Sequence, residues 1–174
     1  EMDLLFPQLF QQPTVLVEMD TRAAVDARSG NPIDEASLRK IAGPDGVVRR
    51  QHFVIPAARP TGLRSAKAYL LTSDRTASAG EHLSLSLKRT KRATLIGETT
   101  RGAGHYGSVE QLDKDFTFDA FVPVGRTFDP DTGEGWEGVG VKPDVEVPAD
   151  KALDEALKLA GVNKSAEVAL AALK

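Results

Sequence analysis

The fold of this chain follows from one stretch of its sequence, KAYLLTSDRTASAGEHLSLSLKRTKRATLI (residues 67–96). Lys67–Thr72 is a compact apolar run typical of a buried strand, and Ala93–Ile96 is a second β-rich run. Between them, a helical pattern extends from about Ser78 to Arg89. A strand, a helix and a strand with short connections predict a βαβ unit, and therefore a parallel sheet.

Further strands are expected on both sides of this unit. Residues 14–19 and 47–55 are β-rich and predict two strands nearer the N-terminus. Residues 108–124 alternate polar with apolar residues and contain aromatics, which is typical of an antiparallel ribbon. The turn-rich residues 128–140 follow it as a loop. The chain is therefore expected to mix parallel and antiparallel strands.

Helices are expected at three other places. Residues 1–12 place apolar side chains at helical spacing, although Pro7 is best tolerated in a first turn. A short helix is expected at Asp34–Ile41. Residues 148–174 predict two amphipathic helices, with Gly161 ending the first. These last helices could contact another subunit, but covering the chain's own sheet is the favoured hypothesis.

The composition excludes several kinds of function. The chain has 174 residues, of which 41% are hydrophobic and 27% charged, so it can bury a core and is not a disordered chain. A net charge of -3 gives no support for a nucleic-acid partner or an anionic membrane surface. The absence of cysteine excludes disulfides, zinc–thiolate sites and thiol catalysis. Three histidines without a His-x-x-x-His pair predict no metal centre, and no cofactor is expected.

Ser78 lies where the expected strand passes into the helix, among the small residues Ala77, Ala79 and Gly80. A serine hydroxyl attacks a carbonyl when a base accepts its proton and backbone N–H groups stabilise the oxyanion. The first turn of a helix supplies such N–H groups, and small neighbours let a substrate approach. Ser78 and Glu81 also form the Ser-x-x-Glu pattern of a capping box. On the local pattern alone, helix capping is the favoured role.

Two longer segments resemble a known family. They are residues 69–104, which contain Ser78, and residues 133–148, GEGWEGVGVKPDVEVP. Both resemble the C-terminal processing (tail-specific) serine peptidases, in particular their tricorn-core and interphotoreceptor retinoid-binding-protein branch. The resemblance extends from about Lys67 to the C-terminus, and more loosely back to residue 1. It implies an α/β fold, a crotonase/Clp-protease-like mixed β-α spiral with an antiparallel ribbon and C-terminal helices.

The resemblance also implies roles for particular residues. Ser78 takes the position of the nucleophile, and the backbone N–H of Ala79 that of an oxyanion-hole donor. Tail-specific members carry a general-base lysine where this sequence has Ala103, which excludes a Ser–Lys dyad. In the tricorn-like branch a histidine from an upstream subdomain activates the serine, and an upstream serine orients that histidine. Glu137 matches the glutamate that closes this relay.

The three histidines of the chain are weaker candidates for the base. His82 follows Ser78 by one helical turn and shares its face, but most histidines in that place are packed helix residues. His105 follows the glycine-rich turn that carries the base in the lysine-type enzymes, yet a surface role is favoured. His52 has no catalytic residue near it in the sequence. The upstream histidine implied by the resemblance is therefore the preferred hypothesis.

Function is expected to be that of a serine endopeptidase that cleaves peptides or unfolded proteins through an acyl-enzyme at Ser78. Main-chain pairing with a strand edge would hold an extended substrate. The loop that supplies the second oxyanion N–H in the family is not found in this sequence. Residues 1–174 are thus expected to be a C-terminal catalytic subdomain, truncated at its N-terminus, partnered by the upstream subdomain and inactive alone. A homo-oligomer is one possible arrangement of the chain.

A non-catalytic module that binds an apolar ligand is the alternative, because retinoid-binding relatives keep the fold. Five aromatic residues could line its pocket: Phe116, Phe118, Phe121, Phe128 and Trp136. The alternation of Phe116 with Phe118 instead favours the core face of a strand. A pure carrier needs neither Ser78 nor Glu137, so their presence favours the enzyme.

Overall fold

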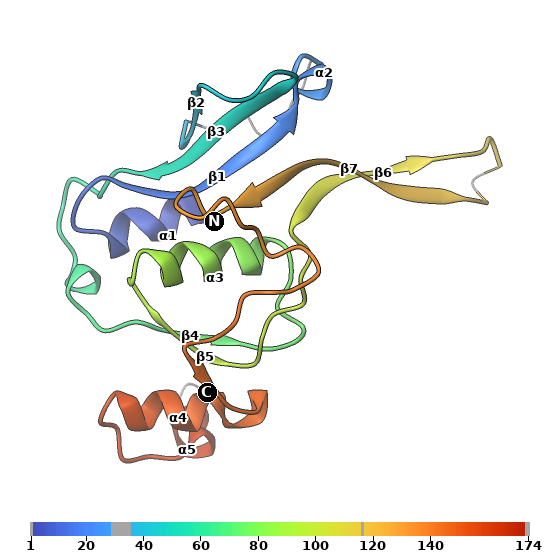
Figure 1. Ribbon diagram of the computed structural model, residues 1–174. Coiled ribbons are helices and arrows are strands. Elements are labelled where there is room, and N and C mark those ends of the chain that lie inside the picture. The colour runs from blue at the N-terminus through green and yellow to red at the C-terminus, as the bar shows by residue number, and fades with distance from the viewer. Residues whose placement is uncertain (1, 29–35, 116, 173–174) are drawn as a thin grey trace.

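The structure is a computed structural model, and it describes residues 2–28, 36–115 and 117–172. Its strands form two separate sheets, one of five strands and one of three. One helix, α3 (Ala79–Arg89), lies between the two sheets and contacts both (Figure 1). This helix therefore links the antiparallel half of the molecule to the parallel half.

The five-stranded sheet is antiparallel throughout, with strand order β2-β3-β1-β7-β6. Two of its strands, β6 and β7, continue beyond the body of the molecule as a projecting ribbon (Figure 1). The ribbon predicted at residues 108–124 is thus confirmed, with longer strands. The strands are β1 (Thr14–Arg22), β2 (Leu38–Ile41), β3 (Val47–Val54), β6 (His105–Gln111) and β7 (Asp119–Phe128).

The three-stranded sheet is parallel, and it confirms the predicted βαβ unit. Its strands β4 (Tyr69–Thr72) and β5 (Thr94–Gly97) pair in register, with α3 as their connection. A short third strand, β8 (Val145–Glu146), pairs with the other side of β5. The side chain of Leu71 in the edge strand β4 is exposed, so the run predicted as buried is buried only in part.

Four α-helices and two short 3-10 turns complete the described chain. The first helix keeps Pro7 in its interior and buries Phe6 against the five-stranded sheet. At the other end, Ala152 and Ala156 of the first C-terminal helix pack on Ile96, so this helix covers the chain's own sheet, and the last helix packs against it. The elements are α1 (Met2–Leu9), α2 (Ala23–Asp26), η1 (Gly62–Arg64), η2 (Ala149–Lys151), α4 (Ala152–Leu159) and α5 (Ala166–Ala171). None of the described helices has the length and apolar character needed to cross a membrane.

Two predictions from the sequence are wrong. Leu38–Ile41 is the strand β2 rather than part of a helix, because Leu38 pairs with His52 across the sheet; residues 34 and 35 lie outside the described chain. Phe118, predicted for the core, is 66% exposed because the ribbon projects from the body, and Phe121 is 56% exposed. Phe116 lies outside the described residues.

Candidate active site

Ser78 occupies a strained backbone conformation at the start of α3. Its φ and ψ angles are 51° and -113°, a region that residues other than glycine adopt rarely and at an energetic cost. A serine that only caps a helix normally has extended angles. Sharp, strained turns from a strand into a helix are known instead for exposing a nucleophilic serine. Ser78 is exposed, so helix capping alone does not explain its backbone.

The carboxylate of Glu81 fixes this turn from the inside. Its side chain is completely buried, and its Oε2 accepts hydrogen bonds from the backbone N–H groups of Ser78 (2.9 Å) and Ala103 (2.8 Å). Its Oε1 accepts from the Thr100 hydroxyl and from the Gly102 N–H, both at 2.6 Å. The predicted capping box is therefore present. It also ties the start of α3 to the turn formed by residues 100–103.

Glu137 fixes the next part of the same turn. Its Oε2 accepts from the backbone N–H groups of Gly104 and His105, both at 2.7 Å, and lies 3.8 Å from His105 Nδ1. The backbone hydrogen bond from His105 is the largest cause that lowers the pKa of Glu137. The carboxylate is consequently anionic at neutral pH. It is half exposed and contacts the pocket through residues 104 and 105 rather than lining it.

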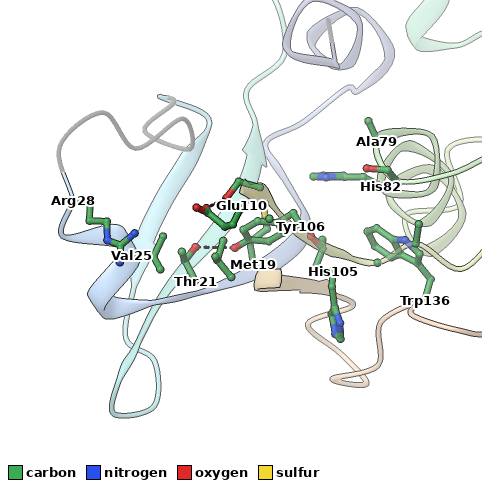
Figure 2. Close-up of a pocket in the computed structure, with 17 residues that line it drawn as sticks. Met19, Thr21, Val25, Arg28, Ala79, His82, His105, Tyr106, Glu110 and Trp136 are labelled. Atoms are coloured by element: carbon green, nitrogen blue, oxygen red, sulfur yellow. Dashed lines mark hydrogen bonds between the residues drawn. The ribbon is translucent and has the colours of Figure 1, made fainter. Parts of the chain in front are cut away.

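Ser78 opens into a pocket of about 450 Å³ between α3 and the five-stranded sheet. Ala79, His82 and Trp136 lie on one side, and Met19, Thr21 and Tyr106 continue the wall toward Val25 and Arg28 (Figure 2). The hydroxyl of Tyr106 forms a hydrogen bond with Thr21 Oγ1 at 2.7 Å and so links strand β6 to strand β1. The remaining lining residues are Ala103, Gly104, His105, Gly107, Ser108, Glu110, Val124 and Thr127.

The structure thus brings together six of the residues singled out in the sequence, all of which line this pocket: Ser78, Ala79, His82, Ala103, His105 and Trp136. The N–H of Ala79 makes no hydrogen bond within the described chain, so it is free to donate to an oxyanion. Ala103 stands where a base lysine is expected, and no lysine is among the described residues that line the pocket.

His82 also lines the pocket, but it belongs to a buried pair. Its Nε2 lies 2.8 Å from His52 Nδ1, and His52 Nε2 lies 3.2 Å from Asp3 Oδ1. Burial is the main cause that lowers the pKa of His82 to about 3, and it lowers the pKa of His52 as well. A general base works best with a pKa near the operating pH, so His82 is poorly suited to that task.

The structure adds contacts and residues that the sequence did not indicate. His52 is in direct contact with His82, a residue of the pocket, and this contact could not be seen from its neighbours in the sequence. The pair forms because β3 and α3 meet only in the folded chain. Asp3 and Tyr106 had no signal in the sequence, whereas the Ser-x-x-Glu pattern did identify Glu81. Of the five aromatic residues proposed for a pocket, the described ones other than Trp136 do not line it.

Comparisons with known proteins agree with this arrangement. The sequence model of Peptidase family S41 matches residues 8–147. Among solved structures, the photosystem II D1 C-terminal processing protease has a TM-score of 0.54 at 22% identity, covering 92% of this chain and 35% of that one. Mature CPAF complexed with lactacystin has a TM-score of 0.63 at 15% identity, covering 92% and 41%. A proposed S41 protease from Bacteroides fragilis NCTC 9343 has a TM-score of 0.55 at 17% identity, covering 91% and 40%.

These likenesses confirm the expected mixed α/β fold with its ribbon and C-terminal helices. At these identities they establish a shared fold. The chain spans between 35% and 41% of the length of these three structures.

The strain at Ser78 predicts the effect of two substitutions. Glycine tolerates a positive φ and alanine does not, so Ser78→Gly should be about 1 kcal/mol more stable than Ser78→Ala. At Lys158, an exposed residue of α4, glycine should instead be about 1 kcal/mol less stable than alanine. Urea unfolding of the four variants measures both differences. Equal stability of the two Ser78 variants would show that the turn carries no strain.

The buried histidine pair predicts that acid destabilises the fold. In the unfolded chain His82 binds a proton near the ordinary histidine pKa of 6.5, whereas the folded chain holds that pKa at about 3. The unfolded state therefore binds more protons between these values, and the free energy of unfolding falls as the pH falls through them, by on the order of 5 kcal/mol.

This acid loss can be measured by urea unfolding at several pH values. His82→Gln keeps a partner for His52 but cannot titrate, so its stability should fall less steeply with acid. Tyr69→Phe removes a remote hydrogen bond to Leu159 and should leave the wild-type slope unchanged. Parallel slopes for His82→Gln and the wild type would contradict the assignment.

Proposed function

Because this chain belongs to Peptidase family S41, we propose that it is the C-terminal catalytic subdomain of a serine peptidase with Ser78 as its nucleophile. The observation that carries this proposal is the backbone of Ser78: exposed, strained, and opening into a pocket beside the free N–H of Ala79. Neither the strain nor the pocket is needed by a serine that only caps a helix. Both serve a hydroxyl that must reach a substrate carbonyl.

The reaction would proceed through an acyl-enzyme. The Ser78 oxygen attacks the peptide carbonyl and gives its proton to a base, and the Ala79 N–H donates a hydrogen bond to the oxyanion. The base then protonates the leaving amine as the C–N bond breaks. Water adds to the resulting ester, and the bond to the Ser78 oxygen breaks as that oxygen recovers a proton. Each peptide bond cleaved consumes one water.

The base is proposed to be a histidine supplied from outside this chain. Arg101 stays protonated and cannot act as a base, and the low pKa of His82 leaves it a weak one. Glu137 would stabilise and orient the imidazolium that forms when the base accepts the serine proton, as the carboxylate of a catalytic triad does. Its lowered pKa and its contact with the turn at His105 support this role.

The substrate is proposed to be an extended peptide or an unfolded protein. The strand β6 is an edge of the five-stranded sheet, and several of its residues line the pocket, from His105 to Glu110. An edge strand offers free main-chain donors and acceptors that pair with a peptide of any sequence. A substrate paired with β6 would pass the mouth of the pocket that holds Ser78.

A binding module for an apolar ligand is the second candidate. Its support is the apolar part of the pocket wall, which includes Met19, Val25, Val124 and Trp136. Phe128 is buried under the guanidinium groups of Arg49 and Arg126 and is not available to a ligand there. A carrier has no use for a strained serine, so the enzyme remains the better proposal.

A fluorophosphonate probe tests both the nucleophile and the missing parts. In a protein that carries the upstream segment as well, the probe should label Ser78, and Ser78→Ala should abolish the label. The 174-residue chain should react roughly 1000-fold more slowly, because one oxyanion donor and the base are missing. Mass spectrometry of the labelled peptide identifies the site.

The outcomes separate the alternatives. Labelling elsewhere than at Ser78, or none in the longer protein, would exclude the peptidase. Quenching of Trp136 fluorescence by a fatty acid or retinoid in that unlabelled protein would support the carrier. Equally fast labelling of the short chain would refute the proposal that it lacks catalytic parts.

A further inference from the structure

The ribbon of β6 and β7 exposes a set of large apolar side chains. Residues 119–123 of β7 pair only with β6, because the pairing of β7 with β1 is limited to residues 125–128. A two-stranded ribbon of this kind is marginally stable in water unless something packs on it. Its exposed apolar residues are Val109, Leu112, Phe118, Phe121 and Val122, each between 37% and 66% exposed. A group of exposed apolar side chains indicates a contact surface.

Two of these side chains lie on the ribbon face that takes no part in the pocket. Val109 and Phe121 are paired directly across the two strands, so their side chains share one face. Ser108 and Glu110 alternate with Val109 along β6, and both line the pocket from the other face. The face of Val109 and Phe121 is therefore available while a substrate lies in the pocket.

The same ribbon is acidic. Residues 108–122 contain four carboxylates and one lysine, a net charge of -3. Asp113 Oδ1 accepts hydrogen bonds from the backbone N–H groups of Thr117 (2.9 Å) and Phe118 (3.0 Å). The bond from Phe118 is the largest cause that lowers the pKa of Asp113, so this carboxylate is anionic at neutral pH. The four acidic residues are Glu110, Asp113, Asp115 and Asp119.

A cleft of about 730 Å³ with the opposite charge lies where the strands of the parallel sheet begin. Tyr69 and Thr94, the first residues of β4 and β5, are part of its lining. The described residues that line it include four cations and no carboxylate: Arg64, Lys67, Lys91 and Arg92. None of these four forms an ion pair within the part of the chain that the structure describes. Positive charge gathered in a cleft attracts an anionic partner.

Backbone carbonyl groups hold the two arginines of this cleft in place. Arg92 donates from Nε to the carbonyl oxygen of Leu9 at 2.6 Å and from Nη2 to that of Leu63. Arg64 donates in the same way to the carbonyl oxygen of Ala57. A carbonyl oxygen carries no net charge, so these bonds orient the guanidinium groups without neutralising them.

We propose that the ribbon of one chain docks in this basic cleft of a second copy, so that the chains associate head to tail. The charges are complementary, and Val145 and Leu159 add apolar lining that the ribbon's Phe121 can contact. The ribbon leaves one side of the molecule, and the turn between α3 and β5, which carries Lys91, lies on the opposite side (Figure 1). A contact between unlike surfaces on opposite sides repeats from copy to copy.

Packing two ribbons against each other would also cover their apolar faces, but the charges disfavour it. Two ribbons with a net charge of -3 each would then lie side by side, and like charges facing each other across an interface are unfavourable. Docking in the cleft replaces this repulsion with attraction. The contact does not involve Ser78, so the inference does not rest on the proposed function.

Analytical ultracentrifugation of the 174-residue chain at several concentrations measures the association. The mean mass should rise above 18.7 kDa with concentration and pass twice that value, with a dissociation constant on the order of 10–100 μM for each contact. Raising NaCl from about 50 mM to about 500 mM should weaken the contact roughly tenfold, because salt screens exposed charges. A chain that is still monomeric at about 500 μM, or a mass that stops at two chains, would overturn the proposal.

Two double variants test which surfaces meet. Lys67→Glu with Lys91→Glu reverses charge in the cleft, and Asp119→Lys with Phe121→Ser changes the ribbon. Each variant alone should associate at least about tenfold more weakly than the wild type. Mixed together, the intact ribbon of the first should dock in the intact cleft of the second. Because each such pair has only one intact contact, the mixture should form pairs and grow no further.

Matched changes elsewhere on the surface are the controls. Lys151→Glu in η2 and Val168→Ser in α5 alter exposed residues of the same kinds and should associate like the wild type. Wild-type association of either double variant, or no pairing in their mixture, would overturn the proposal. Circular dichroism checks that the variants are folded, and the concentration and salt series on the wild type stands without them. None of these results depends on peptidase activity, so a failed contact leaves the proposed function unaffected.

Discussion

One buried carboxylate holds the candidate active site together. Glu81 is completely enclosed, and its two oxygens accept four hydrogen bonds, three of them from backbone N–H groups. A buried carboxylate without such donors would be strongly unfavourable. The four bonds satisfy it and at the same time compel Ser78 and residues 100–103 to keep a single geometry. The strain at Ser78 persists because this network over-determines the turn.

The same arrangement joins the two sheets at the point where chemistry is proposed. The helix α3 belongs to the parallel βαβ unit, whereas the turn at residues 100–103 leads into the ribbon strand β6. Glu81 connects the start of α3 with this turn through its hydrogen bonds. Glu137, in the loop before β8, fixes the following residues, Gly104 and His105. Two carboxylates thus position Ser78 and the start of the edge strand β6 without either lining the pocket.

Local patterns in the sequence predict much of this arrangement, whereas the rest depends on pairings between distant segments and could not be predicted. The apolar runs around α3 indicated the βαβ unit, and the small residues around Ser78 indicated the candidate nucleophile. The strand β2 could not be recognised, because its residues become a strand only by pairing with β3. The exposure of Phe118 depends on the ribbon leaving the body, and the bond between His52 and His82 depends on β3 meeting α3. Neither the exposure of Phe118 nor the bond between the two histidines is determined by residues that are close together in the sequence.

The central claim, that Glu81 positions Ser78 for attack, is tested by Glu81→Gln in the protein that carries the upstream segment. The glutamine is nearly isosteric, but its NH₂ group faces N–H donors where an oxygen stood. The rate of fluorophosphonate labelling at Ser78 should fall about 100-fold while the protein remains folded by circular dichroism. Glu134→Gln, an exposed change in the loop after β7, should leave the rate unaltered. A wild-type rate in folded Glu81→Gln would contradict the account.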